Sequence, residues 1–306
     1  MKKLLAMIRL TRFKEFTFFV IVTTFLGIAA GHGQLSWTLI GVLAANWLSV
    51  MFAFMINDVE DAPDDALNPK KIKRNPVSAG ELSPEAAKNA SLGVAILAVI
   101  LYALLGLWPF LLGFCSLALG FVYSWRKIRV KNIAFLDLAS HCLMLAGLQF
   151  LTGFIAFDRH QPTLQWLIPL IFVVAISLYG ELFNELRDLE GDLKAGLRHT
   201  AVVLGSRLTY WIMMSLLAIG SACGFGTFFV LSIIPTWVIL VLAAALAVFI
   251  AVPAYRIRRH RTALALQESF QKPLEMSGAL ALGVQFAGPW AWSVISSLAR
   301  YVILFR

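Results

Sequence analysis

The sequence predicts an all-α integral membrane protein, a bundle of about nine transmembrane helices that forms one domain over residues 1–306. The first observation behind this prediction is composition. Hydrophobic residues make up 59% of the chain and charged residues 14%, and the mean hydropathy is +0.79. Such values are typical of chains that cross a membrane several times. The second observation is that apolar runs follow one another almost end to end, which leaves no room for a soluble domain.

Each predicted helix corresponds to one apolar run. A helix needs roughly 20 mainly apolar residues to cross the hydrocarbon core of a bilayer. The segment before the first run, MKKLLAMIRLTRFKEF, lacks the cleavage site of a signal peptide, so we interpret it as an amphipathic lead-in at the membrane interface. In order along the chain, the predicted spans are 15–33, 35–57, 89–107, 109–124, 133–157, 165–186, 206–227, 233–253 and 277–299.

The basic residues are divided unequally between the two sides of this arrangement. Of the 26 Lys and Arg residues, 23 fall in the N-terminal arm and in the loops after the second, fourth, sixth and eighth spans. Because cytoplasmic loops carry the excess of Lys and Arg, we expect the N-terminus on the cytoplasmic side and the C-terminus outside, in a bacterial or archaeal-type plasma membrane. The net charge of +9 therefore reflects topology, and we expect no nucleic-acid partner.

Three cytoplasmic loops are expected to cap the bundle, at about 58–88, 125–132 and 187–205. In the first loop, Ser83-Pro84 is typical of a helix N-cap followed by proline at the first helical position. Pro63 interrupts the end of the second span, so we expect that helix to end near Asp61 and a loop to place Asp65.

Small residues inside the predicted spans are interpreted as packing residues. GxxxG spacing at Gly27/Gly31 and at Gly220/Gly224 predicts close contact between helices. The three cysteines also fall inside spans and show no CxxC spacing, so we expect neither a disulfide framework nor a metal site from them.

The most informative motif is a nine-residue pattern that occurs twice, as NDVEDAPDD at 57–65 and as NELRDLEGD at 184–192. Together the two copies hold nine of the chain's 17 acidic residues, and each copy ends a long apolar run. Carboxylates so close to a membrane are costly unless they are paired, bound to metal or exposed to water. Two copies on the same membrane face therefore predict a site built from both halves of the chain.

Helical periodicity gathers the oxygen ligands of each motif on one stripe. Positions 0, 1, 4 and 8 of a helix lie within about 100° of one another. Such hard oxygen ligands suit Mg²⁺, which takes one or two carboxylates together with water and phosphate oxygens. Neither motif contains His or Cys, which argues against zinc or copper. The candidate metal ligands are Asn57, Asp58, Asp61 and Asp65 in the first motif, and Asn184, Asp188 and Asp192 in the second.

Basic residues on the same side of the membrane complete a pattern that is typical of polyphosphate binding. Metal-bridged carboxylates with Arg and Lys donors form a clamp for a diphosphate. Contact with anionic lipids is the alternative role for these cations. The candidates are Arg74, Lys127, Arg129, Lys131, Lys194 and Arg198.

The chain resembles the UbiA superfamily of intramembrane prenyltransferases. NDVEDAPDD fits the NDxxDxxxD motif of that family, NPKKIKRNPVSAGELS resembles its NPxK…RPxxSG segment, and RDLEGDLKAGLRHTAVVLG resembles its RDxxGDxxxGxxT…LG segment. The stretch from Tyr123 to Lys131 is similar to its YSxPPxxxK loop, although Trp125, Arg126 and Lys127 replace the usual prolines. The nine-span layout also agrees with the family.

This resemblance implies a UbiA-like bundle with its active site at the cytoplasmic side. It implies that Mg²⁺ holds the diphosphate of a polyprenyl diphosphate donor between the two motifs, while the apolar chain of the donor lies among the spans. Ionisation of the donor then leaves an allylic cation for a small acceptor molecule to attack. In this reading the catalytic residues are Asp61, Asp188, Tyr123 and Lys131, and the diphosphate-binding residues are Arg74, Lys127, Arg129, Lys131 and Lys194.

Several alternatives stay open at this point. An aromatic acceptor of the quinone-precursor type is the first expectation, because that role is common among members of the family. The same fold is also expected to suit transfer from phosphoribosyl diphosphate to a polyprenyl phosphate, or reaction with a glycerol-phosphate lipid. A divalent cation transporter is a remote alternative, since the spans hold few polar residues, His141 and Gln149 being the clearest. A catalytically inactive assembly factor is a further alternative, which the intact acidic motifs argue against.

Overall fold

The computed structural model of the protein describes residues 2–67, 69–157, 164–194, 196–229, 234–257 and 263–304. Within these ranges the chain forms helices and no strand, which confirms the predicted all-α class. Some side chains in the described helices lie outside the description, namely those of residues 69–70, 194, 228–229, 249–257, 263–270, 292 and 295–304.

The helices follow the predicted spans closely. In chain order they are α1 (Lys2–Leu10), α2 (Phe13–Ala30), α3 (Trp37–Asp65), α4 (Pro69–Arg74), α5 (Pro84–Leu105), α6 (Leu107–Ser124), the 3-10 helix η1 (Val130–Asn132), α7 (Leu136–Cys142), the π-helix η2 (Leu143–Gly147), α8 (Leu148–Phe157), the 3-10 helix η3 (Leu164–Trp166), α9 (Leu167–Lys194), α10 (Thr200–Phe229), α11 (Thr236–Ile257) and α12 (Ala263–Leu304).

Among the described residues, seven helical segments are long and apolar enough to cross a membrane. They comprise α2, α3, α5, α6, α9, α10 and the continuous segment from α7 to α8. In α11 the described apolar stretch covers only Thr236–Val248. The protein is therefore an integral membrane protein with many helices, while the count of nine spans remains a prediction.

The sequence signals at helix ends account for several boundaries and fail at one. Ser83 Oγ accepts a hydrogen bond from Ala86 N at 3.2 Å, so the predicted N-cap of α5 is confirmed. The expectation that Pro63 ends α3 near Asp61 is wrong, because α3 continues to Asp65. Pro63 lies in the last turn and cannot donate to the carbonyl of Val59, so one helix hydrogen bond is lost, but Ala66 N still donates to Ala62 O at 3.1 Å and the turn is kept.

Close helix contacts occur where the glycine spacing predicts them. A Cβ added to Gly27 of α2 would lie 2.1 Å from the backbone oxygen of Phe150 in α8, which is too close for any side chain. A Cβ on Gly220 of α10 would lie 2.8 Å from Ile176 of α9. These two crossings, α2 with α8 and α9 with α10, are therefore close-packed seams of the bundle.

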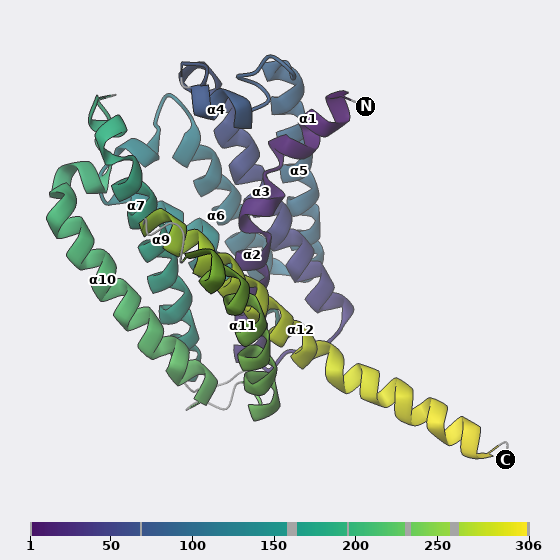
Figure 1. Cartoon of the computed structure of the whole chain (residues 1–306). Coiled ribbons are helices and arrows are strands. Elements are labelled where there is room, and N and C mark those ends of the chain that lie inside the picture. Colours follow the sequence, from purple (N-terminus) through teal and green to yellow (C-terminus); the bar gives the residue numbers. More distant parts are fainter. Residues whose placement is uncertain are drawn as a thin grey trace.

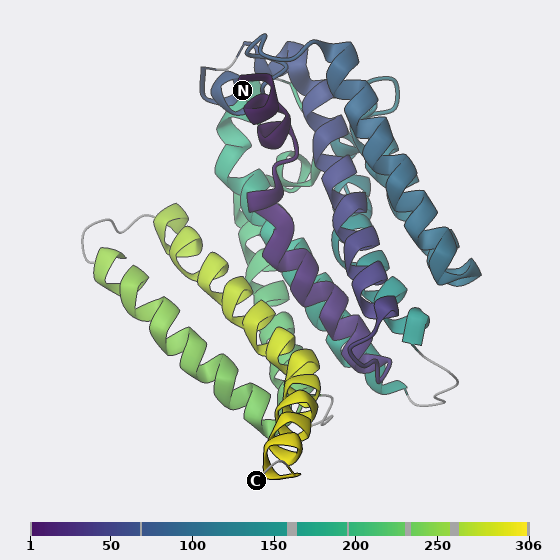
Figure 2. The same ribbon diagram turned by 90° about the vertical axis from the view of Figure 1, so that its right-hand side faces the viewer.

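Figures 1 and 2 show the arrangement of the helices. The N-terminal end of α1, the short helix α4 and the C-terminal ends of α3 and α9 lie at one end of the bundle, and the C-terminal end of α12 lies at the opposite end (Figure 1). Helices α11 and α12 run side by side on one flank (Figure 2), and α12 also packs against α2. Both copies of the acidic pattern therefore lie at the same end, which we name the cap end, because α3 and α9 each finish there.

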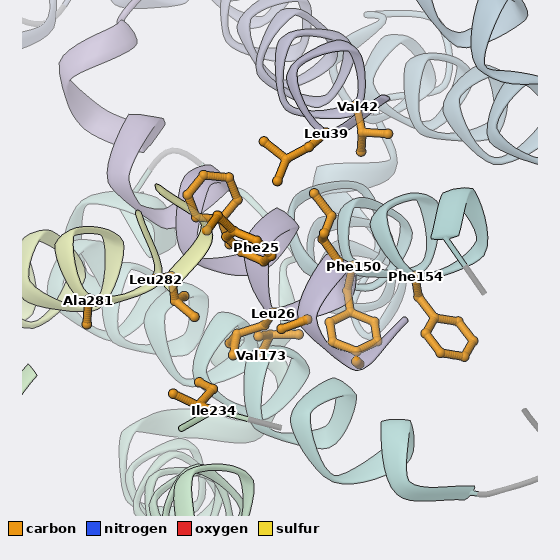
Figure 3. Close-up of a cluster of buried hydrophobic side chains, with 14 of the residues drawn as sticks. Phe25, Leu26, Leu39, Val42, Phe150, Phe154, Val173, Ile234, Ala281 and Leu282 are labelled. Carbon is orange, nitrogen blue, oxygen red and sulfur yellow. The ribbon is translucent and has the colours of Figure 1, made fainter. Parts of the chain in front are cut away.

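The core joins helices that are distant in sequence. Figure 3 shows Phe25 and Leu26 of α2 close to Phe150 of α8, Val173 of α9 and Leu282 of α12, and all of these side chains are buried. This apolar core packs α2 and α8 against α9 and α12. It therefore fixes the relative positions of helices whose other ends lie at the cap end.

Candidate functional site

A cavity of about 890 Å³ lies between the helices that carry the two acidic motifs. Its wall includes residues of α2, α3, α6, α9, α10 and α12. One part of the wall is polar, and the rest is apolar, formed by side chains such as Phe16, Phe19, Met213 and Leu217. A volume of this size suits a small molecule or part of a lipid chain.

Four of the sequence-predicted site residues line this cavity. They are Asn57 of the first motif, Asn184 of the second, Tyr123 at the end of α6 and Arg74 at the end of α4. The first residue of each motif therefore opens into the same space. The equivalent positions in α3 and α9, 127 residues apart in sequence, are brought together as the repeated pattern predicts.

Asn57 and Asp61 of the first motif are held by cations from the link between α6 and α7. Lys131 Nζ donates to Asn57 Oδ1 at 2.9 Å and to Asp61 Oδ2 at 2.5 Å. Arg129 Nη2 donates to Asp61 Oδ1 at 3.1 Å. Burial lowers the pKa of Lys131, and the neighbouring Asp61 carboxylate opposes this effect. Ser124 Oγ also donates to Asn57, at 3.1 Å.

Asp58 and Asp65 of the first motif contact other segments at the cap end instead. Asp58 is fully buried and accepts from Arg12 Nη1 at 3.3 Å, while its Oδ2 has no hydrogen-bond partner among the described residues. Asp65 is buried and accepts from Asn75 Nδ2 at 3.0 Å. The predicted single stripe is thus divided into two faces, with Asn57 and Asp61 on one and Asp58 and Asp65 on the other. A one-residue step along a helix turns the side chain by about 100°, which accounts for the division.

The second motif is supported differently. Asn184 is exposed to the cavity, and the Asp188 side chain is 50% exposed and pairs with its neighbour Arg187 at 3.0 Å. Asp192 accepts from Nε2 of His199, which precedes α10, at 2.9 Å. Burial disfavours a charged imidazole, but the hydrogen bonds to Asp192 and Glu185 outweigh it and raise the pKa of His199 to about 10.

A buried polar group lies behind the second motif. Asp137 of α7, Glu185 of α9 and His199 are all buried, and their ligand atoms lie within 4.8 Å of one another. Three such side chains have the composition of a metal site. Sequence reasoning missed His199 as a functional candidate because it lies outside the nine-residue pattern, seven positions after Asp192.

Sequence reasoning also missed a polar cluster inside the cavity. Glu181 Oε1 accepts from the hydroxyl of Tyr123 at 3.1 Å, and Glu181 Oε2 lies 3.3 Å from His141 Nδ1. All three side chains line the cavity. A signal for Glu181 was present in the sequence, because a carboxylate within an apolar run marks a functional position in a membrane protein.

One of the predicted diphosphate-binding lysines, Lys127, does not join this group. Lys127 is exposed, and its ammonium lies 5.7 Å from the centre of the Trp125 ring. The side chain of Lys194 lies outside the described residues.

Comparison with known proteins gives relatives that act on different molecules. The chain is 34% identical to a lycopene elongase/hydratase of Haloferax volcanii over 166 residues, which is 53% of this chain and 51% of that protein. It is 26% identical to a 4-hydroxybenzoate octaprenyltransferase of Pectobacterium atrosepticum over 216 residues, 68% of this chain and 73% of that protein. The chain thus spans about half the length of the first relative.

The fold is shared with solved structures. A UbiA homologue from Archaeoglobus fulgidus, bound to GPP and Mg²⁺, superimposes with a TM-score of 0.67 at 20% identity, covering 92% of this chain and 98% of that one. The profile of the UbiA prenyltransferase family matches residues 19–272. With both motifs at one end of a helical bundle and a shared cavity between them, the protein belongs to the UbiA prenyltransferase family.

Proposed function

We propose that the protein is a Mg²⁺-dependent membrane prenyltransferase, which moves a prenyl group from a polyprenyl diphosphate to a small acceptor molecule. The observation that carries this proposal is the cavity shared by Asn57 and Asn184. The guanidinium-bearing residues Arg12, Arg74 and Arg187 line it beside these two asparagines. A diphosphate needs the cations, and a prenyl chain needs the apolar wall, so one space serves both parts of the donor.

The donor atoms of the first motif fit a hard cation. The Lys131 ammonium lies between Asn57 Oδ1 and Asp61 Oδ2, so these oxygens already converge on one positive charge. Oxygen ligands of this kind suit Mg²⁺. We assign Asn57 and Asp61 to one metal and, by the repeated pattern, Asn184, Asp188 and Asp192 to a second. In this proposal Asp58 and Asp65 have a structural role, because Asp58 binds Arg12 and Asp65 binds Asn75 at the cap end.

When bound, Mg²⁺ neutralises the diphosphate and so makes it a better leaving group. The chain's own cations Arg74, Arg129 and Lys131 add positive charge on the same side. The C–O bond of the donor breaks, the diphosphate keeps the electron pair, and a new bond forms between the prenyl carbon and the acceptor. The apolar wall excludes water, which would otherwise capture the allylic cation.

The acceptor must give up a proton when the new bond forms. Glu181 is placed for this step in our proposal, because its carboxylate faces the cavity between Tyr123 and His141. Tyr123 donates to one carboxylate oxygen and so fixes the orientation of the group. This pairing leaves Glu181 close to the space that an acceptor would occupy.

We favour an aromatic acceptor of the quinone-precursor type. The octaprenyltransferase relative, which covers the larger share of this chain, takes 4-hydroxybenzoate by its name, whereas the other relative is named for lycopene. Transfer from phosphoribosyl diphosphate and reaction with a glycerol-phosphate lipid remain the alternatives to be tested. A cation transporter is disfavoured, because the polar side chains Asn46, Ser116 and Gln149 are buried and hydrogen-bonded to neighbouring residues.

We further propose that the N-terminus and the cap end face the cytoplasm, that the C-terminus lies outside, and that residues 1–306 act as one domain. The uneven distribution of Lys and Arg supports this orientation. The two ends of the described chain also lie at opposite ends of the bundle (Figure 1), as an N-in and C-out topology requires.

The test is a membrane assay with radiolabelled prenyl diphosphates of several lengths. Each donor is offered with 4-hydroxybenzoate, a glycerol-phosphate lipid precursor or no acceptor, with Mg²⁺ or with EDTA. A separate arm offers radiolabelled phosphoribosyl diphosphate with a polyprenyl phosphate. We expect a labelled aromatic lipid that forms only with Mg²⁺. Product that is unaffected by EDTA would contradict the metal requirement, and product only with another acceptor would replace the aromatic one.

Two variants control this assay. Asp61→Asn removes a charge from the proposed metal site, whereas Glu85→Gln removes a charge from an exposed position in the first turn of α5. We expect product to disappear in the first variant and to persist in the second. Equal activity in both variants would remove the first motif from the site.

A further inference from the structure

The network behind the second motif connects three separate elements. It contains Asp137 from α7, Glu185 from α9 and His199, which immediately precedes α10. Their relative exposures are 1%, 7% and 6%, so each of these polar groups needs a partner within the protein. None of the three lines the cavity. These three residues can therefore affect the cavity only through neighbouring residues.

The two carboxylates are already used by the start of α10. Asp137 Oδ2 accepts from Thr200 N at 2.6 Å, and Asp137 Oδ1 accepts from Thr200 Oγ1 at 2.5 Å. Glu185 Oε2 accepts from Ala201 N at 2.8 Å. The first N–H groups of a helix have no partner within the helix, and carboxylates satisfy them well. This arrangement fixes the beginning of α10 to α7 and α9, and it assigns Asp137 and Glu185 to the protein rather than to an ion.

His199 extends this fixed group to the second motif. Its Nδ1 donates to Glu185 Oε2 at 3.1 Å, and its Nε2 donates to Asp192 Oδ2 at 2.9 Å. Asp192 is thus tied through the imidazole to Glu185, which is itself tied to the backbone of α10. The contrast with Asp188 is clear, because the side chain of Asp188 is 50% exposed and that of Asp192 is 19% exposed.

We propose that His199 is a positioning residue, which holds the Asp192 carboxylate in the orientation that the second metal site requires. The inference rests on the proposed function, in which Asp192 serves that site. An imidazole that donates one N–H to a carboxylate ligand restricts the rotation of that ligand, and loss of such a partner typically weakens metal binding about 10- to 100-fold. Glu185, in turn, fixes the ring of His199.

A matched pair of amides tests this proposal. In His199→Gln the amide nitrogen reaches the position of Nε2 and still donates to Asp192. In His199→Asn the shorter side chain reaches only the position of Nδ1 and donates to Glu185 instead. The probe is Mn²⁺ with inorganic pyrophosphate, and free Mn²⁺ is measured by electron paramagnetic resonance on the full-length protein in detergent. We expect the Asn variant to bind Mn²⁺ about 10-fold more weakly and the Gln variant to stay within about 3-fold of wild type.

Equal Mn²⁺ affinity of the two variants would overturn the role of His199. A purely structural role predicts that both variants lose affinity in proportion to their loss in thermal unfolding midpoint. The double variant His199→Asn/Asp192→Asn distinguishes the cases further. If His199 acts through Asp192, His199→Asn causes no further loss in a protein that already carries Asp192→Asn, whereas additive losses would contradict the proposal.

Two controls separate this inference from the proposed function. Absence of Mn²⁺ binding by the wild-type protein would overturn both. Loss of binding in Asp61→Asn together with normal binding in His199→Asn would overturn the positioning role alone. Should His199→Asn not fold, Glu185→Gln is the second variant, because its amide oxygen still accepts from Ala201 N. We expect Glu185→Gln to weaken Mn²⁺ binding about 5-fold, and unchanged binding would overturn the proposal.

Discussion

The two acidic motifs have nearly the same sequence pattern but are supported by different means. In the first, Asp61 is held by the charged side chains of Lys131 and Arg129, which come from the link after α6. In the second, Asp192 is held by His199, and the network continues through Glu185 to a helix N-terminus. The first motif is thus held by a lysine and an arginine, and the second by a histidine that is itself fixed through Glu185 to the backbone of α10.

This difference indicates how the carboxylates of each motif respond when a metal binds. A cation that pairs with a carboxylate must move or share when a metal binds, so the first motif contains its own competitor for the metal. The second motif also pairs with cations, since Arg187 contacts Asp188 and His199 contacts Asp192, but the Arg187 and Asp188 side chains are 40% and 50% exposed, so this pair separates more readily. The repeated pattern therefore specifies the oxygen ligands, while the surrounding residues determine how firmly each ligand is held.

Asp61→Asn and Asp188→Asn give the largest expected effect. Each removes a charge from a proposed metal site, so we expect turnover to fall about 1,000-fold in both. Asp61→Asn, unlike Asp188→Asn, removes the carboxylate partner of the largely buried Lys131, while Arg129 keeps its ion pair with Asp64, and we expect this variant to lower the free energy of unfolding by about 3 kcal/mol. Turnover and thermal unfolding of each variant check this, and equal destabilisation would remove the contrast between the motifs.

Glu181→Gln tests a group that belongs to neither motif. The change keeps the shape and the acceptor for Tyr123 but removes the charge beside His141. We expect turnover to fall about 100-fold with little change in donor KM, because our proposal assigns the diphosphate to other residues of the cavity. Steady-state kinetics with donor and acceptor varied separately measure both quantities. A large rise in donor KM would instead assign Glu181 to donor binding.

Arg74→Ala should have a moderate effect on binding. Arg74 lines the cavity from α4, on the side of the first motif. Loss of one cation near the diphosphate is expected to raise donor KM about 10-fold, with a smaller effect on kcat. Kinetics over a range of donor concentrations decide this. Unchanged kcat and KM would mean that Arg74 serves only as one of the basic residues that set the orientation of the chain in the membrane.

Lys127→Ala should have the smallest effect. Lys127 belongs to the same link as Lys131 but is exposed over Trp125. We expect donor KM to change less than about 2-fold, since an exposed cation contributes little. Lys131→Ala in the same assay is the matched comparison, and an equal effect of the two variants would show that the whole link binds the donor.

The seven membrane-length helices of the described chain and the paired motifs were predictable because hydrophobic runs and helical periodicity are local properties. Asn57 and Asn184 meet in one cavity as the repeated pattern predicts. The division of the first motif was not predictable, because Arg12 and Asn75 approach Asp58 and Asp65 through tertiary contacts.

The same reason applies to His199 and Glu181. Nothing in the nine-residue pattern indicates that a histidine seven positions later forms a hydrogen bond with Asp192. This contact joins the end of α9 to the residue before α10 and is a tertiary contact. Pro63 illustrates the opposite error, in which a local rule about helix breaking was applied to the final turn, where α3 continues to Asp65.

The glycine seams have a consequence for how such a protein changes during evolution. Gly27 brings the backbone of α2 against that of α8, and Gly220 lets the Ile176 side chain of α9 pack directly on α10, so these two pairs of helices have little freedom to move relative to each other. A lineage that needs to accept a longer isoprenoid therefore has to gain room through side chains instead. Met213 and Met214, which line the cavity, are the natural positions for such changes, because a methionine can be shortened without disturbing a helix. Substrate length can then diversify by single substitutions while the scaffold stays constant.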